Sequence, residues 1–159
     1  IDGRWGSLAS LAACMLLPLL FYRNRKTIYD ILSSTLVTGF AVCSLLGAPG
    51  RLVVPLAYFS FGVMWTASCT RRIPLTAYYS MNQYHGEDAL RNPLFVKTNR
   101  ILTLLWGILY LLTPLWTYAV MGTEAGGWIG AINSVLPLLM GIFTAWFQKW
   151  YPANVAGGK

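Results

Sequence analysis

The sequence predicts an all-α protein, a polytopic transmembrane helix bundle, and three observations lead to this prediction. The chain has 159 residues, of which 56% are hydrophobic and only 11% are charged, whereas a soluble domain carries about 25% charged residues. The charged residues fall between five long apolar runs, each close to the ~20 residues that a helix needs to cross a bilayer. Apolar residues lie on every side of each run, which is typical of helices surrounded by lipid or by other helices.

We expect residues 1–159 to form a single transmembrane domain. The apolar runs place the spans at about residues 5–22, 28–46, 52–70, 101–121 and 128–147. Two short turns, 47–51 and 122–127, contain glycine or proline residues of the kind that interrupt helices. Short turns make successive helices antiparallel neighbours, so spans two and three form one hairpin, and spans four and five form another.

Residues 71–100 separate the third and fourth predicted spans and form the largest polar stretch. Aromatic and apolar side chains mix there with charges and amides. Such a mixture suits helices that lie at the membrane interface, with the aromatic side turned inward. Gly86 and Pro93 would interrupt one long helix. We therefore predict a cytoplasmic interfacial loop that contains two short helices.

The basic residues predict the orientation. One side of the membrane receives only Arg4 and Arg51. The other side receives Arg23, Arg25, Lys26, Arg71, Arg72, Arg91, Lys97, Arg100, Lys149 and Lys159. Basic loops stay in the cytoplasm, so we expect a multi-pass protein of the bacterial inner membrane with a cytoplasmic C-terminus. The positive net charge follows from this topology and from anionic lipid on that face, and the chain has no nucleic-acid-binding motif.

This orientation places residue 1 outside the cell, although the chain begins with Ile1 and not with Met. A cleaved signal peptide would explain that start. We favour a helix missing ahead of Ile1, which would give the intact protein six spans.

Ionisable residues inside membrane spans are the best pointer to function, and Asp30 comes closest to that description. With Thr35 and Thr38 of the same span it could form a polar intramembrane site. A simpler interpretation is that the Asp30 carboxylate meets the positive end of the helix dipole and pairs with Lys26. We favour the simpler interpretation.

Arg71, Arg72, Asn99 and Arg100 bracket the interfacial loop at headgroup depth. Arginine binds phosphate in a bidentate manner, so these four residues are candidate contacts for an anionic lipid headgroup. Topological anchoring alone is the simpler interpretation, and we favour it at this stage.

His85, Glu87 and Asp88 form the one cluster of acids with an imidazole. Such a group could do acid–base work or bind a metal, but the spacing matches no zinc pattern. We interpret the cluster as a solvated loop. The sequence therefore predicts no catalytic residue, cofactor or metal site.

Short motifs give the chain a resemblance to a known family. Arg71-Arg72-Ile73-Pro74-Leu75 ends one span, and Asn99-Arg100-Ile101-Leu102 followed by Trp106-Gly107 opens the next. This pattern, with Tyr22 to Lys26 and the turn Gly47 to Leu52, resembles intracellular septation protein A-like membrane proteins of bacteria. The resemblance covers most of residues 20–147. It implies an inner-membrane protein with a role in septation or in the cell envelope, and no catalytic residue.

Three functions remain open. The first is a non-enzymatic scaffold or subunit of a membrane complex, whose partners are lipid and other membrane proteins or a second copy of the chain. The second is a small transporter or channel, with hydroxyl residues of span two and the prolines Pro114 and Pro137 at its path, although such prolines are ordinary in membrane helices. The third is an enzyme that acts on lipid near His85.

Overall fold

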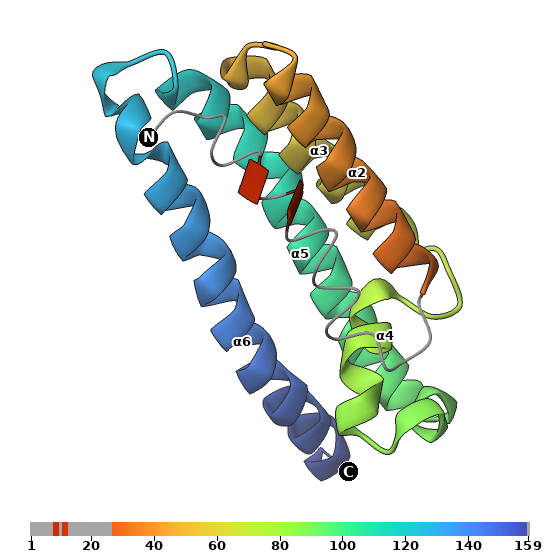
Figure 1. Cartoon of the computed structure of the whole chain (residues 1–159). Helices are drawn as coiled ribbons and strands as arrows, with labels where there is room; N and C mark the ends of the chain where they lie inside the picture. Colours follow the sequence, from red (N-terminus) through yellow and green to blue (C-terminus); the bar gives the residue numbers. More distant parts are fainter. Residues whose placement is uncertain (1–7, 10, 13–26, 159) are drawn as a thin grey trace.

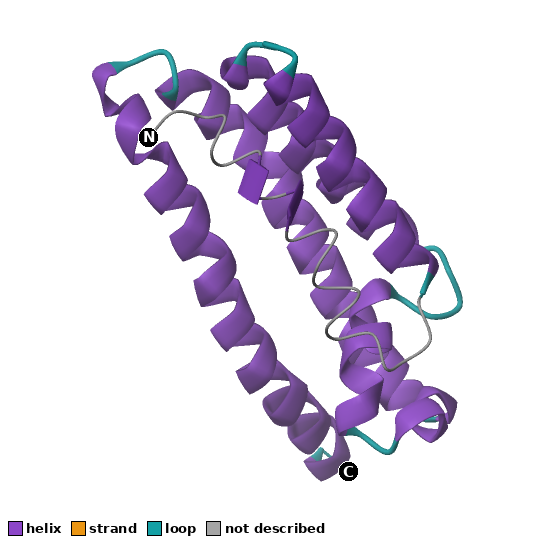
Figure 2. Ribbon diagram, in the orientation of Figure 1, coloured by secondary structure: helices purple, strands orange, loops and turns teal. Residues whose placement is uncertain are grey.

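A computed structural model describes residues 8, 9, 11, 12 and 27–158 of the chain (Figure 1). Within these residues the regular secondary structure is all helical, as expected (Figure 2). The elements are α2 (Ile28–Leu45), α3 (Gly50–Ser68), α4 (Leu75–Ser80), η1 (Met81–Gln83), η2 (Gly86–Arg91), α5 (Pro93–Val120), η3 (Glu124–Trp128) and α6 (Ile129–Gly157). The predicted first span, residues 5–22, lies largely outside the described residues.

Three helical segments in the described part are long and apolar enough to cross a membrane: Ile28–Leu45, Pro93–Val120 and Glu124–Gly157. They correspond to the predicted second, fourth and fifth spans, the first two of them ending one residue early, and they are consistent with a membrane protein. Helix α3 has 19 residues but is not one of the three. Arg51 and several hydroxyl and aromatic residues lower its mean hydropathy, so a third span at 52–70 stays a prediction.

Helix α2 begins at a capping box. The Thr27 backbone N–H donates to Asp30 Oδ2 at 2.7 Å, and the Asp30 N–H donates to Thr27 Oγ1 at 3.3 Å. This reciprocal pair satisfies two backbone donors that the first turn of a helix leaves open. The helix ends before Gly47, whose φ of +90° is a conformation that glycine adopts without strain. The turn at Gly47 leads into α3 and makes the expected hairpin.

Helix α5 begins eight residues before the predicted fourth span. Asn92 caps it, because its Oδ1 accepts from the N–H groups of Leu94 and Phe95 at 2.9 and 3.4 Å. Pro93 occupies the first turn, where its missing N–H costs nothing. A helix break occurs at Pro93, as expected: η2 ends at Arg91, and the proline then starts α5. The polar segment between α3 and α5 therefore ends at Asn92 and not at residue 100.

The most extensive helix contact joins α3 and α5. At Gly62 an added Cβ would lie 2.7 Å from the backbone nitrogen of Leu111, and at Gly107 it would lie 2.5 Å from Thr66 Cγ2. These two glycines bring the helices together, as small residues do in membranes. Aromatic rings fill the contact beside them, with the ring centres of Trp65 and Trp106 5.4 Å apart.

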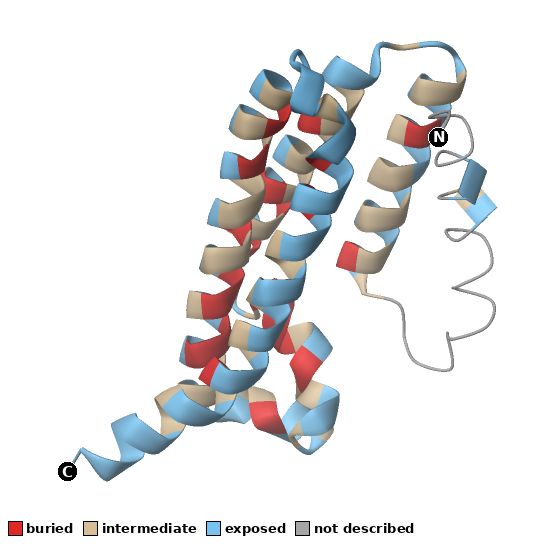
Figure 3. Cartoon of the chain, turned by 90° about the vertical axis from the view of Figure 1, so that its left-hand side faces the viewer, coloured by how far each residue is buried: buried red, intermediate tan, exposed pale blue. Residues whose placement is uncertain are grey.

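Helix α6 packs on α5 and leaves most of its surface exposed (Figure 3). Leu138 and Ile142 are 64% and 62% exposed, as expected for side chains that face lipid. Pro137 lies inside α6 and Pro114 inside α5, as predicted, and α6 also contains Pro152. The helix continues ten residues past the predicted end of the fifth span.

The long helices run side by side in alternating directions (Figures 1 and 3). The turns 46–49 and 121–128 lie at one end. The other end holds α4, the 3₁₀ helices η1 and η2, the start of α5 and the end of α6. At this second end, polar segments meet the apolar helices.

Candidate functional site

Most of the described basic residues belong to segments at the end of the molecule that holds α4 (Figure 1). The described basic residues there are Arg71, Arg72, Arg91, Lys97, Arg100 and Lys149. Arg51 lies at the opposite end, with its guanidinium carbon 4.5 Å from the centre of the Tyr118 ring. Among the described residues, the basic residues that we assigned to opposite sides of the membrane therefore lie at opposite ends of the helices.

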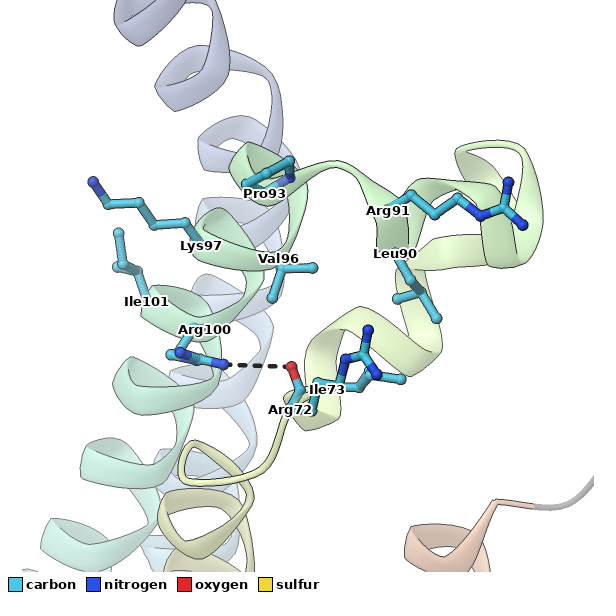
Figure 4. A pocket seen from close by; sticks show the side chains of 9 residues that line it. All are labelled: Arg72, Ile73, Leu90, Arg91, Pro93, Val96, Lys97, Arg100 and Ile101. Atoms are coloured by element: carbon cyan, nitrogen blue, oxygen red, sulfur yellow. Dashed lines mark hydrogen bonds between the residues drawn. The ribbon is translucent and has the colours of Figure 1, made fainter.

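A groove of about 530 Å³ opens at the basic end, between the start of α5 and the segment that precedes it (Figure 4). Its charged lining consists of Arg72, Arg91, Lys97 and Arg100. Its apolar lining consists of Ile73, Leu90, Pro93, Val96 and Ile101. We call it the basic groove. Its volume falls within the range of about 300–1,000 Å³ of small-molecule sites.

Arg100 fixes one wall of the basic groove. Its Nη2 donates to the backbone carbonyls of Arg71 and Arg72, at 3.2 and 3.4 Å, and so attaches the turn after α3 to the side of α5. The Nε and Nη1 atoms of Arg100 make no hydrogen bond to a described residue. A guanidinium has five N–H donors in a planar fork, so three of them remain to bind an anion.

The other cations of the basic groove are weakly compensated. Arg91 Nη1 lies 3.5 Å from Asp88 Oδ1, and both side chains are exposed by 75% or more. Such a surface pair contributes little, and Figure 4 shows Arg91 turned away from α5. Arg72 and Lys97 have no carboxylate partner among the described residues. The groove therefore keeps a net positive charge.

The basic groove combines unpaired cations with an apolar wall. Leu90 and Val96 face each other across it (Figure 4). A free phosphate would use the cations alone, whereas a lipid headgroup would use the cations and continue as an acyl chain along the apolar side chains. Arginine at such a position favours phosphate because its planar fork matches two phosphate oxygens.

The structure separates Asn99 from the three arginines with which we grouped it. Asn99 is only 1% exposed, and its Oδ1 accepts hydrogen bonds from Ser80 Oγ and Gln148 Nε2 at 2.7 and 3.1 Å. Its Nδ2 donates to the Phe95 carbonyl at 2.9 Å. Since these bonds lie within the protein, Asn99 has no free surface for a headgroup, and it positions α4, α5 and α6 instead.

Asn99 belongs to a buried polar cluster. The Thr76 hydroxyl donates to the Asn99 carbonyl at 2.9 Å and lies against the Thr103 hydroxyl, and the Thr76 N–H donates to Thr103 Oγ1 at 3.1 Å. Within the described residues no buried side-chain nitrogen or oxygen lacks a partner. A satisfied cluster of this kind makes the fold rigid, and so it supports the basic groove from behind.

Asp30, Thr35 and Thr38 do not meet in one site. Tyr79 Oη donates to Asp30 Oδ1 at 3.1 Å, so the carboxylate connects the start of α2 to α4 at the basic end, in addition to its capping role. Thr35 and Thr38 are exposed further along α2, and the Thr35 hydroxyl donates to the Ile31 carbonyl at 2.8 Å. The capping role of Asp30 agrees with the simpler interpretation of a stabilised helix start, whereas its predicted partner Lys26 lies outside the described residues.

His85, Glu87 and Asp88 lie around η2, and His85 has a positive φ of 68°. His85 and Asp88 line a cavity of about 530 Å³ together with Tyr84 and Phe95. Among the described residues no three His, Cys, Asp or Glu side chains lie close enough to hold a metal ion. The arrangement offers a polar surface beside the basic groove, without a set of metal ligands.

Two cations of the basic groove were not among the predicted site residues. Lys97 lies one turn before Arg100 on α5, and Arg91 lies in η2. If a helix begins at Pro93, Lys97 and Arg100 lie on the same face of it, because residues three apart are neighbours on a helix surface. The sequence signal was the Asn92-Pro93 start itself.

Comparisons with protein-family models, with curated proteins and with solved structures find no match to the chain. The function is therefore inferred from the geometry of the basic groove.

Proposed function

We propose that the chain is an integral membrane protein whose basic groove binds the phosphate of an anionic lipid headgroup. One observation carries this proposal: unpaired guanidinium and ammonium groups line a groove with an apolar wall, at the end of helices that are apolar enough to cross a membrane. Juxtamembrane basic residues attract anionic lipid by about 1 kcal/mol each. The groove adds a fixed geometry to that attraction.

The proposed setting is the bacterial inner membrane, with five spans in this chain and the basic end in the cytoplasm. The positive-inside rule supports this orientation, because the described cations other than Arg51 gather at the α4 end. Helix α3 is included as a span because it packs along α5 over its length. A bundle of these spans is part of the same proposal.

We infer a non-enzymatic role as a scaffold or subunit of a membrane complex, related to the cell envelope. The resemblance to intracellular septation protein A-like proteins supports septation or envelope maintenance as the process. Lipid bound at the groove would fix the cytoplasmic end of the helices and orient the surface that other membrane proteins contact.

The proposal is tested by native mass spectrometry of the full-length protein, purified in mild detergent and mixed with phosphatidylglycerol or zwitterionic phosphatidylethanolamine. Phosphatidylglycerol is expected to remain bound and phosphatidylethanolamine to dissociate. The double variant Arg72→Gln/Lys97→Gln removes two cations, or about 2 kcal/mol, and should weaken phosphatidylglycerol binding by roughly 30-fold. The matched control Lys149→Gln removes a cation from the same end outside the groove and should have little effect.

Equal retention of both lipids, or equal losses in the double variant and the control, would contradict lipid binding at the groove. The same spectra test the scaffold role, because a stoichiometric protein partner would support it. Protein that is purified repeatedly with lipid and without a partner would refute it.

A further inference from the structure

A second groove lies on the other side of the turn after α3. Its volume is about 500 Å³, close to that of the basic groove, and it opens between α2, α3 and α4. Arg71 and Arg72 supply its charge, and Ile28, Leu32 and Met64 supply part of its apolar wall. Neither arginine side chain has an ion-pair partner among the described residues. Both grooves therefore have the same character, a cationic end and an apolar wall.

The two grooves share one wall. Arg72 and Ile73 line both of them, so these two residues form a ridge between the grooves. The hydrogen bonds from Arg100 Nη2 to the carbonyls of Arg71 and Arg72 hold the ridge against α5. Thr76, three residues beyond Ile73, is buried in the polar cluster around Asn99 and fixes the other side of the ridge.

We propose that the ligand is a single lipid with two phosphate groups, a diphosphatidylglycerol-type lipid, whose headgroup straddles Arg72. This inference rests on the proposed function, that the basic groove binds an anionic lipid. One phosphate lies in the basic groove near Lys97 and Arg100, and the other lies in the second groove near Arg71. The Arg72 guanidinium lies between the two phosphates.

Three features favour one two-phosphate lipid over two single-phosphate lipids. The ridge is narrow enough for the same two residues to line both sides. Each groove has its own apolar wall, which suits a lipid that carries acyl chains on each phosphate. Once the first phosphate is bound, the second is held at a high effective concentration and needs no separate binding event. Basic pockets on the cytoplasmic side of membrane helices bind such headgroups.

The experiment uses the full-length protein in nanodiscs of zwitterionic phosphatidylcholine, doped with either cardiolipin or phosphatidylglycerol. The cardiolipin is added at half the molar fraction, so that the phosphate content is equal. Native mass spectrometry after release from the disc is expected to show one cardiolipin per chain. Cardiolipin should bind on the order of a hundredfold more tightly than phosphatidylglycerol, because its two phosphates bind as a linked pair.

Single variants separate the two grooves. Lys97→Gln removes a cation from the basic groove alone, and Arg71→Gln removes one from the second groove alone. Each should weaken the same cardiolipin adduct, and the cardiolipin preference should fall in both. Lys149→Gln is the matched control, because it lies outside both grooves, and it should leave the preference unchanged. The variants change exposed side chains, and circular dichroism checks that the helices are retained.

The outcomes separate this inference from the proposed function. Two bound phosphatidylglycerol molecules, each bound as tightly per phosphate as cardiolipin and each lost in a different variant, would overturn the single two-phosphate lipid. Binding of anionic lipid would still be supported. A cardiolipin preference that survives Arg71→Gln would also overturn it, since the second groove would not be used. Failure of both anionic lipids to bind above phosphatidylcholine would overturn the proposed function as well.

Discussion

At the scale of single residues, Gly62 determines how closely α3 approaches α5. A Cβ at this position would lie 2.7 Å from the backbone nitrogen of Leu111, and a backbone atom cannot rotate away as a side chain can. We expect Gly62→Ala to destabilise the protein by about 1–3 kcal/mol, the usual cost of overpacking. The thermal unfolding temperature in detergent measures this change.

Gly141→Ala is the matched control for Gly62→Ala. A Cβ at Gly141 on α6 meets no atom within 4 Å, so the unfolding temperature should be unchanged or slightly higher. Equal losses in the two variants would show that the effect comes from glycine replacement in general and not from the contact between α3 and α5.

Asn99 is a second position at which one side chain decides the local structure. Asn99→Ala removes the acceptor of Gln148 Nε2 and leaves a space in the buried cluster, which should cost about 1–3 kcal/mol. Asn154→Ala is a close control. Asn154 Nδ2 donates to the Trp150 carbonyl at 2.9 Å, as Asn99 Nδ2 donates to the Phe95 carbonyl, but Asn154 is exposed. Chemical unfolding should show a loss for Asn99→Ala and little change for Asn154→Ala.

At the scale of helices, α5 and α6 are joined by polar side chains spaced along their contact. Trp106 Nε1 donates to Thr144 Oγ1 and Trp116 Nε1 donates to Asn133 Oδ1, each at 3.0 Å. The Asn133 Nδ2 donates in turn to Thr117 Oγ1 at 2.9 Å. Such bonds connect helices in lipid, where the hydrophobic effect gives no preference for helix contact over lipid contact.

We therefore expect Asn133→Leu combined with Thr144→Val to loosen α6 selectively. Interhelical hydrogen bonds in membranes are worth about 0.6 kcal/mol on average, so the loss should be one or two kcal/mol across the three bonds. Hydrogen exchange should increase along α5 and α6, where they face each other, and stay unchanged where α3 packs on α5. Uniform exchange along all helices would refute the separate role of this contact.

At the scale of the whole molecule, the charges at the two ends predict the orientation in the membrane. In a variant without the natural cysteines, Ala125→Cys in η3 and Ala153→Cys in α6 place thiols at opposite ends of the helices. Ala125→Cys should react with a membrane-impermeant maleimide in intact cells. Ala153→Cys should react only after the cells are permeabilised, because the basic end faces the cytoplasm.

Labelling of both thiols in intact cells would contradict a membrane-spanning arrangement of α6. The reverse pattern would contradict the proposed orientation and place the two lipid grooves on the outer face. The two outcomes are distinguishable because η3 and the C-terminal part of α6 lie at opposite ends of the helices (Figure 1).

Much of the helical framework was predictable from the sequence, and the reason is local. Apolar runs with few charges identify membrane helices without reference to their neighbours, so the all-α class and the helices α2, α5 and α6 followed from the sequence. The start of α5 was misplaced because Pro93 can either break a helix or begin one. The Asn92 cap decides between the two.

The candidate site was predictable only in part. Arg71, Arg72 and Arg100 were selected because they flank apolar spans, and all three contribute to the grooves or to the ridge between them. Asn99 was grouped with them by its position in the sequence, whereas the structure buries it. Adjacent residues on a helix point about 100° apart, so Arg100 can face a groove while Asn99 faces the interior.

The sequence by itself determined the class of the protein, its apolar segments and the uneven distribution of its charges, because each of these depends on composition and order alone. Only the tertiary structure decided which cations share a groove and which polar residues are buried. Those properties depend on the close contact of α3 with α5 and on the attachment of the Arg71–Arg72 turn to Arg100. Residues far apart in the chain make these contacts, and no local pattern encodes them.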